Sequence, residues 1–428
     1  MTERTTNGVA GAAAALALTA CSIAAPFSTT PFGLSNGARL PVQSGAATGY
    51  RMLYAFGQDG KADDGRTPLA GLAALGGALY GTTAYGGTTT SACTIGCGSL
   101  FRVSRAGSEL VLHRFKSGAA DGASPLAELL VVGGTLYGTT SAGGGARACS
   151  GGCGTVFASD DRGKTRVLHR FAGGSEGAQP SAGVVALNGV LYGTTTYGGR
   201  STPCLMGCGT VFRLNADGTN AKVIYAFKGG ADGAQPAGAL LSIGGALYGT
   251  TAYGGGSTPF CSTGCGTIFR IEPDGTGEAV LHRFAYGPRN ADGAYPAAGL
   301  AVLAGVLYGT TSSGGLGGGT VFSMPASSKR ERTIHVFLPN TNDGVHPAAR
   351  LVAVNGALYG TTRDGGTRGR GTIFSISATG RERVLYSFAG KPDGATPRAQ
   401  LSALAGTLYG TSATGGATGG GTVFAFTP

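Results

Sequence analysis

The tetrapeptide Leu247-Tyr248-Gly249-Thr250 is one of seven copies of Leu-Tyr-Gly-Thr in this chain of 428 residues, and these copies decide the fold. Successive tyrosines are 57, 55, 56, 60, 51 and 50 residues apart. A fixed period in this range is typical of a repeat architecture, in which each unit is one supersecondary element. The seven tyrosines are Tyr80, Tyr137, Tyr192, Tyr248, Tyr308, Tyr359 and Tyr409.

Two further strand patterns keep the same period. A Gly-Thr/Ser-aliphatic-Phe segment follows each tetrapeptide and ends at Phe101, Phe157, Phe212, Phe269, Phe322, Phe374 and Phe424. A Leu/Ile-(Tyr/His)-x-Phe segment ends at Phe56, Phe115, Phe171, Phe227, Phe284, Phe337 and Phe388. The aliphatic, aromatic and threonine residues of these segments fit a pleated, half-buried surface.

Each unit therefore predicts four short strands. In the fourth unit we expect them at Gly238–Ile243, Ala246–Thr251, Gly266–Ile271 and Glu278–Phe284. Gly244-Gly245 and Asp274-Gly275 lie between neighbouring strands and suit tight hairpin turns, because these residues tolerate positive φ. No sustained helical period occurs after the N-terminal region, so the chain is predicted to be all-β.

Seven units of four antiparallel strands predict a seven-bladed β-propeller. The first unit begins with only its last strand, Tyr50–Phe56, and the last unit lacks that strand after Leu401–Phe426. One blade is thus predicted to be shared between the two ends, which closes the ring and leaves no open sheet edge. An open solenoid would instead carry atypical capping repeats at its ends.

Composition adds little about partners. The 82 glycines fall at fixed offsets in the repeat, so they indicate turns rather than low complexity. The formal net charge is +11, but the basic residues are scattered and Lys329-Arg330-Glu331-Arg332 is the one dense run. We therefore expect a solvated, mildly basic surface and no nucleic-acid partner. We also expect a monomer that needs no cofactor.

The N-terminus predicts export. An apolar stretch, Val9–Ala20, is too short to span a bilayer comfortably and precedes Cys21. Leu18-Thr19-Ala20-Cys21 resembles the bacterial lipobox, which implies removal of residues 1–20 as a lipoprotein signal peptide and lipidation of Cys21. An ordinary signal peptide or an uncleaved anchor stays open, since Glu3 offsets Arg4. Residues 21–49 then form a flexible tether and residues 50–428 the propeller.

The remaining eight cysteines form four pairs with identical spacing of four: Cys93/Cys97, Cys149/Cys153, Cys204/Cys208 and Cys261/Cys265. An even number in an exported chain favours four local disulfides. Metal binding is the rival interpretation, but each pair stands alone without a nearby histidine or second pair. We predict no metal site.

The cysteine pairs mark the candidate working face. They lie between the Leu-Tyr-Gly-Thr strand and the following Phe strand, where the first four units span 20 or 21 residues from Tyr to Phe and the last three span 14 or 15. If the strands run from inner to outer, this loop shares a face with the connector between units. Uneven loops on a rigid scaffold are common binding sites; crosslinking solely against proteolysis is the alternative. Candidate binding residues are Tyr85, Tyr197, Tyr253, Arg363, Asp364, Arg368 and Arg370.

An acidic residue opens each connector, followed by Gly, two residues and Pro. These residues are Asp64, Asp121, Glu176, Asp232, Asp292, Asp343 and Asp393. A ring of carboxylates could hold a cation, but a carboxylate before glycine more commonly accepts backbone hydrogen bonds in a turn. His113, His169, His282 and His335 take the strand position of Tyr54, Tyr225 and Tyr386 in other units, so they are interpreted as structural. We find no catalytic constellation.

Together, Leu-Tyr-Gly-Thr-Thr, the double glycine after it (Gly86-Gly87 to Gly415-Gly416), Gly-Thr-Val-Phe and Asp-Gly-Ala-x-Pro resemble the bacterial choice-of-anchor GloVer tandem repeat (Gloeo/Verruco type). The resemblance covers Tyr50 to the C-terminus. It implies display at the cell surface and is tied to no activity. The chain has no tryptophan, which counts against WD and quinoprotein repeats and against kelch repeats, which share the double glycine.

Three functions remain open from the sequence. The first is a lipid-anchored envelope propeller, at the outer membrane or cell surface, that binds a glycan or a protein without chemistry of its own. The second is an envelope enzyme, a lyase or hydrolase of polysaccharide, for which the charged departures in the sixth unit, Arg363-Asp364 and Arg368–Arg370, are candidates. The third is a purely structural surface protein.

Overall fold

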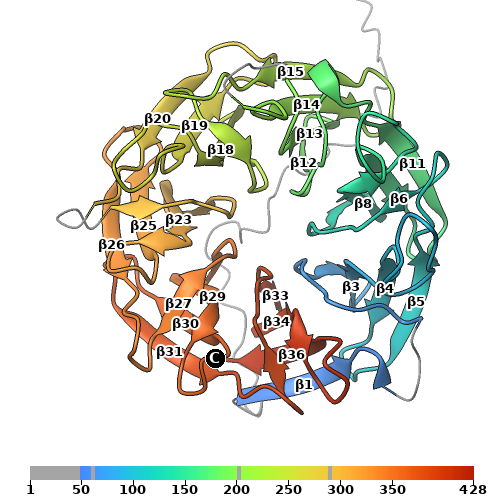
Figure 1. The fold of residues 1–428 in the computed structure, drawn as a ribbon. Helices are drawn as coiled ribbons and strands as arrows, with labels where there is room; N and C mark the ends of the chain where they lie inside the picture. The colour runs from blue at the N-terminus through green and yellow to red at the C-terminus, as the bar shows by residue number, and fades with distance from the viewer. Residues whose placement is uncertain (1–48, 59–62, 200–203, 288–291) are drawn as a thin grey trace, which may run out of the picture.

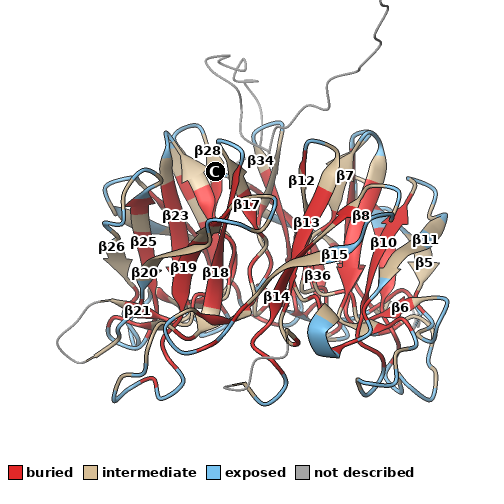
Figure 2. Ribbon diagram, turned by 90° about the horizontal axis from the view of Figure 1, so that it is seen from above, coloured by how far each residue is buried: buried red, intermediate tan, exposed pale blue. Residues whose placement is uncertain are grey.

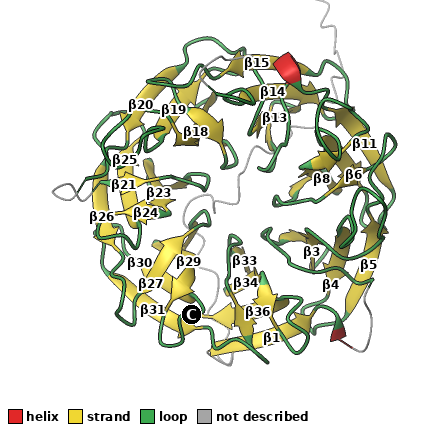
Figure 3. Ribbon diagram, in the orientation of Figure 1, coloured by secondary structure: helices red, strands yellow, loops and turns green. Residues whose placement is uncertain are grey.

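The computed structural model describes residues 49–58, 63–199, 204–287 and 292–428. Seven four-stranded antiparallel sheets are arranged in a ring, which is a seven-bladed β-propeller, as predicted (Figure 1). Strand and loop make up nearly all of these residues, and helix is confined to short 3-10 turns such as η2 (Gly174–Glu176) (Figure 3). The predicted signal peptide, Cys21 and most of the tether lie outside the described residues.

The strands of each blade follow one another from the centre of the ring outward (Figure 1). Blade 1 consists of β2 (Ala73–Leu75), β3 (Ala78–Thr83), β4 (Ser99–Val103) and β5 (Glu109–Arg114). Blade 2 consists of β7 (Leu130–Val132), β8 (Thr135–Thr140), β10 (Thr155–Ser159) and β11 (Thr165–Arg170). Blade 3 consists of β12 (Val185–Leu187), β13 (Val190–Thr195), β14 (Thr210–Asn215) and β15 (Lys222–Ala226).

Blades 4 to 6 repeat this order. Blade 4 consists of β17 (Leu241–Ile243), β18 (Ala246–Tyr253), β19 (Thr267–Ile271) and β20 (Ala279–Arg283). Blade 5 consists of β22 (Ala301–Leu303), β23 (Val306–Thr311), β25 (Thr320–Pro325) and β26 (Arg332–Val336). Blade 6 consists of β28 (Val352–Val354), β29 (Ala357–Gly365), β30 (Thr372–Ile376) and β31 (Glu382–Ser387). The inner strand has three residues rather than the six predicted at Gly238–Ile243, because the segment before it runs along the neighbouring blade.

The seventh blade joins the two ends of the chain. It consists of β33 (Ser402–Leu404), β34 (Thr407–Ser412), β36 (Thr422–Thr427) and, from the other end, β1 (Gly49–Ala55). Strand β1 pairs antiparallel with β36, from Gly49 opposite Thr427 to Ala55 opposite Thr422. Figure 1 shows the blue first strand beside the red last one. The predicted shared blade is confirmed.

Each blade has the same internal packing. The glycine of Leu-Tyr-Gly-Thr lies directly opposite the Phe of the next strand, as Gly249 does with Phe269. A Cβ on Gly249 would come within 2.5 Å of the Phe269 ring, so the position needs glycine. The same glycine–phenylalanine approach, at 2.3–2.6 Å, recurs in all seven blades. The tyrosine of the tetrapeptide is buried in six copies, and in the sixth blade Tyr359 is half-buried against the apolar layer.

Neighbouring blades pack through phenylalanine pairs and buried threonines. The Phe that ends each outer strand contacts the Phe of the next blade edge to face, as Phe227 does with Phe269 at 5.1 Å between ring centroids. The Thr250 hydroxyl donates to the Ala298 carbonyl of the next blade. Seven such apolar layers form the core. Within the residues described here, no helix is long and apolar enough to cross a membrane.

Candidate binding face

The long loops and the connectors between blades share one face of the ring, here named the loop face. Short connector strands pair with the start of the loop in each blade: β6 (Gly122–Ala123) with β9 (Ala142–Gly143), and β21 (Gly293–Ala294) with β24 (Ser313–Gly314). Strands β16 (Ala234–Pro236), β27 (Gly344–Pro347), β32 (Gly394–Ala395) and β35 (Thr414–Gly415) take part in the same pairing. The loop face lies at the lower edge of Figure 2, where β6 and β21 are labelled. The predicted common face is confirmed.

A ring of strained residues is presented on this face. The residue before each connector proline has a φ between 51 and 59° without being glycine. The seven are Thr67, Ser124, Gln179, Gln235, Tyr295, His346 and Thr396. This backbone region is sparsely populated for residues with a side chain, and such strain persists only where surrounding contacts hold it. Because five residue types occupy the seven positions, the ring is uniform in backbone and varied in side-chain chemistry.

A hydrogen bond to the preceding blade holds each of these residues. Tyr295 N–H donates to the Cys265 carbonyl at 2.8 Å, and Gln235 N–H donates to the Cys208 carbonyl at 2.7 Å. The acceptor is the second cysteine in blades 1 to 4. It is Gly318, Arg370 or Gly420 in the three blades that have short loops. The long or short loop of each blade thus holds the connector that leads into the next blade.

All four predicted disulfides form: Cys93–Cys97, Cys149–Cys153, Cys204–Cys208 and Cys261–Cys265. The second cysteine of each pair is fully buried. It packs in the apolar layer between blades, while the first lies nearer the surface in most copies. Each bridge therefore anchors a long loop to the core at the residue that bonds the next blade. Four disulfides also indicate an exported protein, because such bridges persist in oxidising compartments.

The tips of these loops expose large apolar side chains. Leu205 is fully exposed, and Ile95, Met206 and Phe260 are 60, 61 and 52 % exposed. Leu316, in the shorter loop of blade 5, is 68 % exposed. Of the nine exposed large hydrophobic residues in the described part of the chain, seven lie on the loop face: Tyr85, Ile95, Leu205, Met206, Phe260, Leu316 and Leu338. Of these residues only Tyr85 was a candidate from the sequence, although Ile95, Leu205, Met206, Phe260 and Leu316 each lie within two residues of a loop cysteine or glycine.

The three candidate tyrosines occupy one structural position. Tyr85, Tyr197 and Tyr253 each lie at or just after the end of the second strand and pair with the connector of their own blade. Tyr85 is 37 % exposed, whereas Tyr197 and Tyr253 are half-buried against the blade cores. Tyr253 also contacts Tyr295 of the strained ring, with centroids 5.4 Å apart. These side chains line the loop face at different depths.

In blade 6 the charged candidates divide into two groups. Asp364 accepts from Arg363 Nε at 2.6 Å and lies 2.9 Å from His346 Nδ1. Hydrogen bonds from Arg363 and His346 lower the pKa of Asp364, against the effect of its own burial. Arg368 and Arg370 are exposed on the following loop and are not part of this cluster. His346 was not named from the sequence as a candidate binding residue. Its position directly before the connector proline Pro347 would have indicated that it belongs to the loop face.

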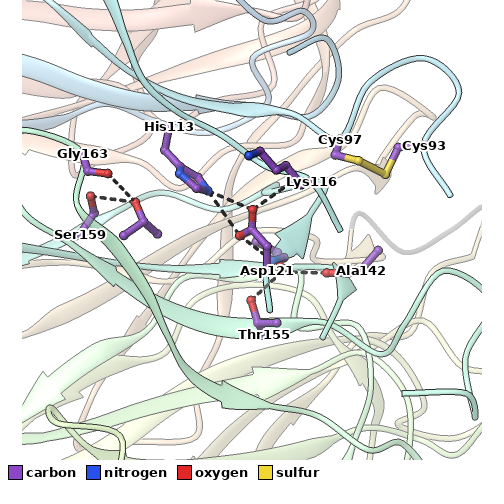
Figure 4. Close-up of polar contacts among 12 residues, drawn as sticks. Cys93, Cys97, His113, Lys116, Asp121, Ala142, Thr155, Ser159 and Gly163 are labelled. Atoms are coloured by element: carbon purple, nitrogen blue, oxygen red, sulfur yellow. Dashed lines mark hydrogen bonds and ion pairs between the residues drawn. A yellow bond between two sulfur atoms is a disulfide. The ribbon is translucent and has the colours of Figure 1, made fainter. Parts of the chain in front are cut away.

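The connector carboxylates accept backbone hydrogen bonds, as predicted for a turn. Asp121 accepts from Lys116 N–H at 3.0 Å and from Gly122 N–H at 2.8 Å. It also lies 3.1 Å from His113 Nε2 on the outer strand (Figure 4). Asp393 receives the hydroxyl of Tyr386 at 2.8 Å in the same manner. The strand histidines and tyrosines thus lie against the turn, consistent with a structural role.

A polar network near the axis of the ring was not foreseen. Arg350 Nε donates to Gln400 Oε1 at 2.6 Å, and Arg350 lies 3.4 Å from Glu128 Oε2. Burial raises the pKa of Glu128, and the charge of Arg350 opposes that rise. Other blades have Gly71, Gly183, Ala239 and Gly299 at this position, three residues after the connector proline. Aligning the seven copies on that proline would have shown that Glu128, Arg350 and Gln400 replace the small residues of the other blades.

One known protein family matches this chain over most of its length. The model of the Gloeobacter/Verrucomicrobia repeat matches residues 27–202, 146–339 and 316–428, which is nearly the whole chain. The chain belongs to this repeat family. Each of the three matches spans more than one blade of the propeller. No curated protein matches the sequence.

Solved structures show only distant likeness to this member of the repeat family. One is described as "Crystal structure of Nidogen/Laminin Complex", with 13 % identity and a TM-score of 0.41, covering 68 % of this chain and 91 % of that one. Another comes from a structural and mechanistic analysis of two prolyl endopeptidases, with 13 % identity and a TM-score of 0.46. It covers 86 % of this chain and 50 % of that one.

Proposed function

We propose that this protein is a lipid-anchored propeller of the bacterial cell envelope whose loop face binds a partner protein. The repeat family, the propeller fold and the four disulfides support a rigid exported module. The observation that carries the proposal is the set of exposed apolar tips on disulfide-anchored loops. Apolar side chains held away from the core by a short crosslink keep their contact area available at little further loss of conformational entropy on binding.

A protein fits these tips better than a glycan does. Leucine, isoleucine and methionine at the loop tips offer apolar area without hydrogen-bonding groups, and methionine is enriched in protein interfaces. The tyrosines and Phe260 offer aromatic contact area on the same face. A glycan would depend on the aromatic and polar residues and would be indifferent to Leu205 and Met206. The two partners can therefore be separated by mutation.

The test is a binding assay of purified protein against envelope proteins and envelope glycans. Replacing Ile95, Leu205, Met206 and Phe260 by serine is expected to weaken protein binding at least tenfold, since several buried anchors are lost together. The matched control is Leu110→Ser, which removes a 56 % exposed apolar residue from an outer strand. Equal binding by the wild-type and four-serine proteins would refute the proposal.

The anchor is tested separately. Cys21→Ser is expected to remove lipid labelling and to move the protein from the membrane fraction to the soluble fraction. Continued labelling would show that the lipobox interpretation is wrong. Because Cys21 precedes the propeller in the chain, the binding assay on purified protein gives the same answer for both forms if the two parts of the proposal are independent.

The His346–Asp364–Arg363 cluster favours a second candidate, an envelope enzyme acting on polysaccharide. A histidine held by a carboxylate can serve as a general base or acid, and an adjacent guanidinium can bind an anionic sugar. The test is cleavage of acidic envelope polysaccharides by the wild-type protein and by His346→Ala and Asp364→Asn. Cleavage that both substitutions abolish would favour the enzyme, whereas an inactive wild-type protein would exclude it for those substrates.

A further inference from the structure

The contacts between neighbouring outer strands, here named seams, place three side chains together. The first is the Tyr or His two residues before the Phe of one outer strand. The second is the connector carboxylate that follows it. The third lies six residues before the corresponding Phe of the next blade. In the seam between blades 3 and 4 these are Tyr225, Asp232 and Glu278, joined by hydrogen bonds of the tyrosine hydroxyl.

Two seams contain a histidine and two carboxylates. They are His282, Asp292 and Glu331 between blades 4 and 5, and His335, Asp343 and Glu382 between blades 5 and 6. In each set, one ligand atom from every residue lies within 4.8 Å of the others. Strand β26 takes part in both, because Glu331 directly precedes it and His335 lies within it.

The first seam is compact and buried. His282 Nε2 lies 3.4 Å from Asp292 Oδ2 and 3.8 Å from Glu331 Oε2. The side chains of Asp292 and Glu331 are only 10 and 8 % exposed. In the second seam, His335 Nε2 lies 3.5 Å from Asp343 Oδ2. Such separations are longer than ordinary hydrogen bonds to an imidazole nitrogen.

Each of these seams contains buried polar atoms that have no hydrogen-bond partner. They are His282 Nε2 and Glu331 Oε1 in the first seam, and His335 Nε2 and Glu382 Oε1 in the second. An unpaired buried polar atom is costly, and a buried carboxylate more so. In each seam, one histidine nitrogen and one glutamate oxygen therefore remain available to a ligand.

The other histidine seams provide an internal comparison. Where the third position is Thr165 or Ala221, the histidine hydrogen-bonds the connector carboxylate directly. His113 Nε2 lies 3.1 Å from Asp121, and His169 Nε2 lies 3.0 Å from Glu176. Among the four histidine seams, the distance from the histidine to the connector carboxylate is thus longer, and Nε2 lacks a hydrogen-bond partner, where a second carboxylate is present. In the Tyr225 seam, the tyrosine hydroxyl lies 2.9 Å from Asp232 Oδ1 and 3.1 Å from Glu278 Oε2, while Glu278 Oε1 has no partner.

We propose that these two seams are divalent transition-metal sites, each with one imidazole nitrogen and two carboxylate oxygens as protein ligands. One nitrogen and two oxygens suit Zn²⁺ or a similar borderline ion better than Ca²⁺ or Mg²⁺, which prefer all-oxygen sites. Two ligands on a tetrahedral zinc with bonds of about 2.0–2.1 Å stand about 3.3–3.4 Å apart, close to the nitrogen–oxygen separations of 3.4 and 3.5 Å. One ion would link blades 4 and 5 at their outer edge, and the other would link blades 5 and 6.

The test is zinc stoichiometry of the full chain with its disulfides intact. Protein freed of metal by chelation is titrated with ZnCl₂ in a calorimeter, and retained zinc is measured after gel filtration. The wild-type protein is expected to keep two ions per chain. Glu331→Gln and Glu382→Gln are each expected to keep one, and the double variant none, because glutamine preserves shape and removes a charged ligand.

Three further variants distinguish these seams from other zinc ligands. Thr165→Glu supplies the missing carboxylate to His113 and Asp121, and is expected to raise the count to three. His346→Ala removes the histidine of the loop face and is expected to leave the count at two. His282→Tyr rebuilds the Tyr225 arrangement, and is expected to lose one ion while keeping the fold stable without metal.

Two outcomes would overturn the proposal. One is a wild-type protein that retains no zinc, together with glutamine variants that melt at a higher temperature, which would show that the carboxylates hold protons only. The other is an unchanged count in the Glu331→Gln, Glu382→Gln double variant, which would place the bound zinc elsewhere. Circular dichroism of every variant confirms that the ring has folded before either result is scored.

Discussion

At the scale of the residue, the glycine of Leu-Tyr-Gly-Thr does more than turn the chain. It lies in the middle of a strand, where glycine is ordinarily unfavourable, and makes room for the ring of the opposite phenylalanine. Gly249 and Phe269 therefore act as one packing unit. The repetition of this pair in each blade explains why the tetrapeptide and the Phe strand recur at the same period.

This pairing predicts non-additive stability effects. Gly249→Ala is expected to lower the free energy of unfolding by about 2 kcal/mol, because the new methyl group overlaps the Phe269 ring. Phe269→Leu removes the far end of that ring, so the double variant is expected to lose less stability than the two single losses combined. Denaturant unfolding of the four proteins gives the coupling, and strict additivity would contradict the clash.

How far sequence predicts structure also differs from residue to residue. Tyrosine, threonine and glycine at fixed offsets predicted the blade, because period and turn chemistry are local properties. The contact of Glu128 with Arg350 joins residues 222 positions apart, and no local pattern reports on such a pair. The seam histidines were assigned a structural role from the alternation of His and Tyr. Their different partners depend on a third residue of the next blade, which that alternation does not include.

At the scale of the element, the disulfide loops combine two tasks. The buried second cysteine and its carbonyl hold the next connector, while the tip stays exposed. The fourth loop, residues 254–266, shows this most completely, with Cys265 bonded to Tyr295 N–H and Phe260 52 % exposed beside Cys261. The sequence predicted the bridges and their face, because both follow from spacing and strand order. It did not predict which tip side chains would remain in solvent.

This arrangement predicts a local effect of reduction. Dithiothreitol is expected to speed chymotrypsin cleavage after Phe260 by about 30-fold, because a short bridge is worth about 2 kcal/mol of loop ordering. Cleavage after Leu316, 68 % exposed on a loop without cysteines, is the control and should keep its rate. Peptide mapping by mass spectrometry follows both sites. Equal acceleration at the two sites would indicate that reduction loosens the whole ring instead.

At the scale of the whole molecule, the ring depends on one strand for its closure. Strand β1 supplies Tyr54, and Phe56 follows directly after it; both are buried against residues of blades 1 and 7 such as Leu72 and Val423. The Phe56 carbonyl also accepts from Thr418 Oγ1 at the other end of the chain. These contacts follow from the incomplete first and last repeats, which is why closure could be predicted from the sequence.

Removing that strand should open the ring. A chain that begins at Gly57 is expected to be less stable by at least about 5 kcal/mol than one that begins at Gly49, since two buried aromatic side chains and a complete strand are lost. Thermal melting of the two chains measures the difference. A synthetic peptide of residues 49–56 is expected to restore part of it, and equal melting of both chains would contradict non-covalent closure.

The shared blade also sets an order in time. The strand that is synthesised first has its partner near the very end of the chain, and Phe56 and Thr418 are 362 positions apart. Bringing such distant segments together costs about 5 kcal/mol of chain entropy before any contact compensates for it. During biosynthesis β1 must therefore wait, unpaired, until the ribosome has released the last blade. The first strand of the propeller to emerge is therefore the last to reach its final place.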